Sequence, residues 1–155
     1  TGPVAYVVGG WTIGNVTTLQ SGAPFTVTTQ TNTSNSFSAG SQRADVSADP
    51  NLPSGQRTVA SWFNTSLFSQ PALYSFGNQG RDILRGPGLI NVDFSLLRNF
   101  TIHENKVVQL RGEFLNALNH TNLSLPASTY GAPGFGSITA SGPARQIQIG
   151  ARIEF

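Results

Sequence analysis

Apolar and polar residues alternate with period two in three segments of the second half of the chain: residues 89–102, 106–119 and 144–155. A period of two places the two sets on opposite faces of a β-strand, so each segment is predicted to be a long strand. Arg98 interrupts the apolar set of the first segment, where it either reaches toward an interface or is displaced by a bulge. The apolar positions are Ile90, Val92, Phe94, Leu96, Phe100 and Ile102, then Val108, Leu110, Gly112, Phe114 and Leu118, then Ile147, Ile149, Ala151, Ile153 and Phe155.

An earlier strand is expected over residues 10–28, with poorer alternation and a bend at Gly22-Ala23-Pro24. The connection at 103–106 is short and polar, which predicts a tight hairpin. Residues 29–88 and 120–143 form two long connections rich in Ser, Asn, Gly and Pro, and the first is expected to be loosely placed. The predicted fold is therefore all-β, an antiparallel up-and-down meander.

The predicted strands match the thickness of a membrane. Roughly 9–11 tilted residues cross the hydrocarbon layer, and such strands must close into a barrel because every backbone polar group in lipid needs a partner. The smallest membrane barrels have about eight strands. The chain offers four, so we expect it to be the C-terminal part of a larger outer-membrane barrel. The absence of Met agrees with Thr1 not being a natural start, and Pro3 to Val8 does not resemble a signal peptide.

The face opposite the apolar one carries charged residues that a barrel lumen can hold as cross-strand pairs. These residues are Asp93, Arg111, Glu113, Arg152 and Glu154. Long loops of outer-membrane barrels face outward and short turns face the periplasm. We therefore expect 103–106 on the periplasmic side and both long loops outside.

Composition excludes several other classes of protein. Charged residues make up 10% of the chain and hydrophobic residues 38%. Soluble domains carry about 25% charge, and a transmembrane helix needs about 18 apolar residues in a row, which the chain lacks. Zero Cys excludes disulfides and thiol chemistry, and a net charge of +2 does not indicate nucleic acid.

No catalytic or cofactor-binding arrangement can be assembled, so no enzyme activity, cofactor or metal is predicted. His103 and His120 have no convergent partners at a metal-ligand or catalytic spacing. Asp45, Asp49 and Asp82 lie in the long loop, where calcium is the less favoured alternative because no EF-hand spacing occurs.

Aromatic residues in the first long loop suggest that it folds back on something. Trp62, Phe63 and Phe76 either contact cargo in an outer vestibule or fasten the loop to the barrel rim, the favoured alternative. Trp11 and Phe100 are candidates for an aromatic girdle at the membrane interface.

An ordered set of short motifs resembles Oar-like TonB-dependent receptors over nearly the whole chain. The motifs are Gly9-Gly10-Trp11, the Thr18 to Val27 stretch, Trp62-Phe63-Asn64, Phe76 to Arg81, Leu84 to Gly88, Asp93 to Leu96, Leu110 to His120 and Ala144 to Gly150. The resemblance implies a bacterial outer-membrane barrel of about 22 strands with a plug in its lumen, serving substrate uptake.

The same resemblance implies the partners. These are outer-membrane lipid, the rest of the barrel and its plug, and TonB only through N-terminal regions that this chain lacks. Phe155 resembles the terminal aromatic that the barrel assembly machinery reads by β-augmentation. The alternative from another class of protein is a secreted β-sandwich adhesin or glycan-binding module. Such a protein would bury the apolar side of its strands between two sheets.

Overall fold

The computed structural model describes residues 8–36, 40–103 and 106–155. Within them the chain forms two compact units, one of residues 8–20, 89–122 and 142–155, the other of residues 21–88 and 123–141. Residues 104 and 105 of the predicted hairpin turn lie outside the described residues.

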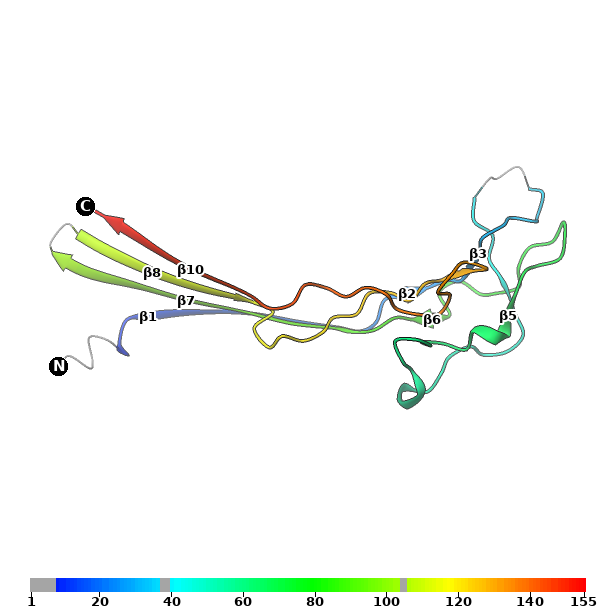
Figure 1. The fold of residues 1–155 in the computed structure, drawn as a ribbon, viewed down its shortest axis with the longest axis horizontal. Helices are drawn as coiled ribbons and strands as arrows, with labels where there is room; N and C mark the ends of the chain where they lie inside the picture. Colours follow the sequence, from blue (N-terminus) through cyan, green and yellow to red (C-terminus); the bar gives the residue numbers. More distant parts are fainter. Residues whose placement is uncertain (1–7, 37–39, 104–105) are drawn as a thin grey trace. The chain divides into compact units, whose positions relative to one another are not determined.

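The first unit is a four-stranded antiparallel sheet in the order β1-β7-β8-β10, drawn as the long arrows of Figure 1. The strands are β1 Trp11–Gln20, β7 Leu89–His103, β8 Lys106–Leu115 and β10 Gln146–Glu154. Sequential long strands are neighbours, which confirms the predicted antiparallel arrangement. Their lengths of 10, 15, 10 and 9 residues suffice to cross a bilayer.

In this register, the apolar residues of neighbouring strands gather on one side of the sheet. We call this side the apolar face. Directly paired residues such as Phe94 and Phe114, whose ring centroids lie 6.0 Å apart, share it. Its members are Trp11, Ile13, Asn15, Thr17, Leu19, Ile90, Val92, Phe94, Leu96, Arg98, Phe100, Val108, Leu110, Gly112, Phe114, Ile147, Ile149, Ala151 and Ile153.

Large side chains of the apolar face remain open to the surroundings. Ile13 is 63% exposed, Ile149 84% and Ile153 67%. The other sheets within the described residues are pairs of two-residue strands. The secreted β-sandwich alternative needed a second sheet over these side chains, and the described residues supply none.

Arg98 stays on the apolar face, opposite Trp11 on one side and Leu110 on the other. The register shift of β7 falls between Thr101 and His103, beyond Arg98, so a bulge does not redirect this arginine. Its guanidinium carbon lies 5.5 Å from the Trp11 ring centroid and 4.4 Å from that of Phe100, and the residue is 4% exposed. The two predicted girdle aromatics thus hold the charge by cation–π contact.

The opposite side carries most of the charged and neutral polar residues, together with apolar residues such as Val16, Leu97 and Val107, and we call it the polar face. The predicted cross-strand charge pairs do not form there. Arg111 pairs with Glu113 on its own strand, and Arg152 pairs with Glu154 at 2.9 Å. The reason is the register, which places Gly150 opposite Arg111 and so leaves the nearest opposite charge two residues along the same strand.

Two strands are shorter than expected. β8 ends at Leu115 rather than residue 119, because Asn116 and Asn119 adopt left-handed backbone angles (φ 49° and 52°) that end a strand. The Asn116 amide closes the turn by accepting the His120 N–H at 3.0 Å and donating to its carbonyl at 2.9 Å.

β1 ends at Gln20, and the expected continuation to residue 28 belongs to the second unit. Gly22 is the cause: its backbone passes so near Gly86 that a Cβ would lie 1.9 Å from the Gly86 carbonyl oxygen. Only a glycine allows this approach, and Pro24 two residues later cannot donate to a long ladder.

The second unit is a small folded body rather than the loosely placed connection expected for residues 29–88. Its elements are short and mutually paired: β2 Pro24–Phe25 with β6 Leu84–Arg85, β3 Thr28–Thr29 with β9 Thr129–Tyr130, β4 Asp45–Val46 with β5 Phe68–Ser69, and the 3₁₀ turns η1 Ser54–Gln56 and η2 Thr65–Leu67. The β3–β9 pair is parallel, so the second long connection packs with the first.

A core explains why this unit is ordered. Six buried apolar residues form its core cluster: Phe25, Val27, Ala44, Phe63, Phe68 and Leu84. Phe63 is its centre, with ring centroids 5.8 Å from Phe25, 5.6 Å from Phe68 and 5.3 Å from Phe135. Burying one such ring stabilises the fold by roughly 1.5–3 kcal/mol.

Candidate functional site

The three aromatic residues predicted to meet cargo or fasten the loop lie in different surroundings, all within the second unit. Phe63 is 1% exposed in the core. Trp62 packs against that core, donates its Nε1–H to the Arg85 carbonyl at 2.8 Å and carries the Arg57 guanidinium over its ring at 5.9 Å. Phe76 is 74% exposed, so of the three it offers the most open ring face.

Phe76 is held beside Arg43 by the pairing of two chain segments, residues 76–79 and 43–46. The Asn78 N–H donates to Asp45 Oδ1 at 2.8 Å, and Asn78 Oδ1 accepts the Val46 N–H at 2.7 Å. Gly77 makes the approach possible, because a Cβ there would lie 2.0 Å from the Arg43 carbonyl oxygen.

The base of this region is fixed by a buried amide. Gln79 is 1% exposed, and in the orientation that satisfies both groups its amide donates to the Val27 carbonyl at 2.9 Å and accepts the Val27 N–H at 3.0 Å. A side chain thus completes the backbone bonding of a core residue, as a neighbouring strand would.

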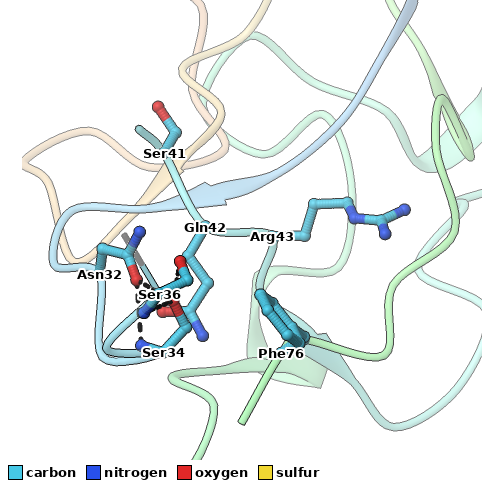
Figure 2. A pocket seen from close by; sticks show the side chains of 8 residues that line it. Asn32, Ser34, Ser36, Ser41, Gln42, Arg43 and Phe76 are labelled. Atoms are coloured by element: carbon cyan, nitrogen blue, oxygen red, sulfur yellow. Dashed lines mark hydrogen bonds between the residues drawn. The ribbon is translucent and has the colours of Figure 1, made fainter. Parts of the chain in front are cut away.

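A hollow of about 180 Å³ opens over these segments, and Figure 2 shows its walls. Asn32, Ser34 and Ser36 gather on one side, joined by bonds of 2.6 Å from the Ser34 hydroxyl to Asn32 Oδ1 and 2.9 Å between the two hydroxyls. Arg43 and Phe76 form the other side. The hollow therefore combines neutral hydrogen-bonding groups with an aromatic ring, and the Arg43 side chain extends from its edge.

Arg43 also lines a second, larger hollow of about 520 Å³ with Thr26 and Arg81. Arg81 is placed by its neighbour Asp82, whose N–H donates to the Thr26 hydroxyl at 2.8 Å while that hydroxyl donates to Asp82 Oδ1 at 3.0 Å. Two arginines thus line one open space. Sequence reasoning missed them because Arg43 and Arg81 are 38 positions apart and neither belongs to a charge cluster.

The aspartates weighed as calcium ligands are each used by the local backbone or side chains. Asp45 accepts from Asn78, Asp82 from Thr26, and Asp49 Oδ1 from the Asn51 N–H at 3.0 Å and amide at 2.8 Å. The Asn51 N–H and then its amide lower the pKa of Asp49 below its usual 3.8. No group of three or more His, Cys, Asp or Glu residues gathers at one point in the described parts of the chain.

The remaining predicted residues lie in or next to the first unit. His120 Nδ1 lies 3.1 Å from Asn122 Oδ1, beside the turn that ends β8. Asn122 in turn bonds both backbone groups of Ile90, at 2.9 Å each. Phe155 follows β10 and is 97% exposed.

These features define a membrane barrel wall: long antiparallel strands, an exposed apolar face and a polar face with its own charge pairs. The comparison with family models agrees, since residues 1–148 match the family described as "Outer membrane beta barrel domain". The chain belongs to this family, and its place is the bacterial outer membrane. Neither curated proteins nor solved structures gave a match. Among the described residues no helix has the length and apolarity needed to cross a membrane.

Proposed function

We propose that the chain forms part of the barrel wall of an Oar-like TonB-dependent receptor, which takes up a substrate across the outer membrane. The observation that carries the proposal is the sheet with two chemically different faces. The apolar face suits acyl chains, and the polar face suits a water-filled or plugged lumen. The ordered motifs described above supply the resemblance to this receptor type.

The proposal includes an orientation for the strands. Register pairs Gln20 with Leu89 at one end of the sheet, while β7 and β8 meet at His103 and Lys106 at the other. Short turns of outer-membrane barrels face the periplasm and long connections face outward. The second unit, inserted between Gln20 and Leu89, then belongs to the outer side.

The open edges of the sheet indicate which partners the chain needs. Within the described residues no further strand pairs with the outer edge of β1 or of β10. Unpaired backbone groups in lipid are costly, so both edges call for more barrel strands. Lipid, the remaining barrel with its plug, and the assembly machinery acting through Phe155 are the partners that we propose, with TonB reached only through plug-side regions outside this chain.

Cysteine labelling tests the orientation, because the chain has no Cys of its own. Ser54 lies at the exposed η1 turn of the second unit, and Lys106 lies at the hairpin end of the sheet. On intact cells, a membrane-impermeant maleimide should label Ser54→Cys, and it should label Lys106→Cys only after the outer membrane is permeabilised. The reverse pattern, or equal labelling of both, would overturn the orientation.

Coding sequence tests the receptor type. We expect a signal peptide and a plug domain to be encoded upstream of Thr1 in the same reading frame. Their absence would leave the membrane barrel standing and remove the TonB-dependent assignment.

A further inference from the structure

The second unit contains four arginines, and the side chains of two of them form no hydrogen bond with the described residues. Arg57 donates its Nε–H to the Leu52 carbonyl at 2.8 Å and covers Trp62, and Arg85 donates to the Gly22 carbonyl at 3.4 Å. The side chains of Arg43 and Arg81 make no hydrogen bond or ion pair with the residues that the structure describes. They are nevertheless the two that line a common hollow.

No acid of the described residues forms an ion pair with either guanidinium. The ion pairs found within the described residues, Arg111–Glu113 and Arg152–Glu154, belong to the other unit. The acids nearest in sequence, Asp45 and Asp82, are bonded to Asn78 and Thr26 respectively. Two unpaired arginines beside one hollow leave their N–H donors available to an anion.

The neighbouring hollow adds groups that suit a sugar. Phe76 presents an aromatic ring that is 74% exposed, beside Arg43. Asn32 and Ser36 supply amide and hydroxyl groups on the facing wall. Binding sites of this kind combine an apolar platform with a few placed polar groups that fix the orientation of the ligand.

From this geometry we infer that the second unit binds an acidic oligosaccharide. Its carboxylate meets Arg43 and Arg81, which suit a planar, bidentate partner. An adjoining sugar ring packs its C–H face on Phe76, and its hydroxyl groups bond to the Asn32 side of the hollow. The inference rests on the proposed function: if the chain is part of an uptake receptor, the acidic oligosaccharide is the cargo that its outer loops capture.

Calorimetric titration of the whole barrel protein in detergent tests the inference, with trigalacturonate as the probe and a neutral galactose trimer for comparison. We expect the acidic trimer to bind and the neutral one to bind at least tenfold more weakly. Arg43→Gln and Arg81→Gln should each weaken binding roughly tenfold or more, the usual effect of losing a charged hydrogen bond. Raising the salt concentration should weaken the wild-type interaction, because exposed charges are screened.

Arg85→Gln is the matched control, an exposed arginine of the same unit that lines neither hollow, and its affinity should stay within twofold of wild type. Phe76→Ala should weaken the acidic trimer while leaving the unfolding midpoint unchanged. Absence of binding, equal binding of both trimers, or equal losses in all three arginine variants would overturn the inference.

Labelling of Ser54→Cys separates this test from that of the proposed function. If Ser54→Cys is labelled on intact cells but trigalacturonate does not bind, only the inference fails. If trigalacturonate binds as expected but Ser54→Cys is labelled only in permeabilised cells, the outward orientation fails while the binding site stands.

Discussion

An arginine introduced on the apolar face should cost far more than the same arginine one residue away. Ile149→Arg places a charge on that face, where Ile149 is 84% exposed. Gln148→Arg places it on the polar face of the same strand, opposite Glu113. The two variants share strand and charge and lie only one residue apart in depth, so their difference reports what each face touches.

The magnitude follows from the position of Ile149 in β10. The strand runs from Gln146 to Glu154, so Ile149 is one residue from its middle. With a rise of about 3.4 Å and a tilt of about 40°, that is about 2.6 Å from mid-depth. An arginine facing lipid near the midplane costs about 2–4 kcal/mol of folding free energy. A surface substitution in water would change it by about 0.5 kcal/mol or less.

The assay is equilibrium urea unfolding of the barrel in phosphatidylcholine vesicles, followed by tryptophan fluorescence. Ile149→Arg should lower the free energy of unfolding by about 2–4 kcal/mol. Gln148→Arg should stay within about 0.5 kcal/mol of wild type, since the polar face meets water and Glu113 lies across from it. Equal effects of the two variants would refute the assignment of the faces.

Three further predictions concern the second unit. Gly77→Ala should destabilise it by about 1–3 kcal/mol in urea melts, because the added methyl would lie 2.0 Å from a backbone oxygen; Gly55→Ala, with open space around its Cβ, should not. Phe63→Ala should cost about 3–5 kcal/mol in the same measurement through the cavity it leaves, and a loss under 1 kcal/mol would contradict its place in the core. The depressed pKa of Asp49 favours the folded state above 3.8, a contribution lost as the pH falls through the native pKa; carboxyl NMR titration should show that midpoint below 3.8 and shifted upward by Asn51→Ala.

The sheet could be predicted from the sequence because its strands are long and alternate. Nine or ten residues of period two, as in β10 and β8, repeat the same signal several times. Alternation could not predict the end of β8. Leu118 stands at the next apolar position of the pattern, although the backbone already turns at Asn116. The end of β1 likewise depends on the approach of Gly22 to Gly86, two residues far apart in the sequence.

The second unit could not be predicted as a folded body. Its strands are two residues long, too short to show any period, and its core residues are scattered from Phe25 to Phe135. The presence of Trp62, Phe63 and Phe68 in one polar stretch did indicate that it folds against something. These aromatic residues pack in or against the unit's own core, which residues of both long connections form.

The candidate site was only partly visible beforehand. Phe76 was singled out as an aromatic residue of the loop, but its exposure and its neighbour Arg43 emerge only from the pairing of residues 76–79 with 43–46. The shared hollow of Arg43 and Arg81 depends on tertiary contacts of Thr26 and Asp82. Residues so far apart in the sequence form no local motif, so their proximity cannot be predicted from the sequence.

The contact between the apolar face and lipid is tested most directly by spin labels placed one at a time along β10 from residue 147 to residue 153, with the barrel in vesicles. The odd-numbered labels should collide mainly with lipid-dissolved oxygen and the even-numbered labels mainly with a water-soluble nickel chelate, in strict alternation. Nickel access at every position would contradict the contact with lipid.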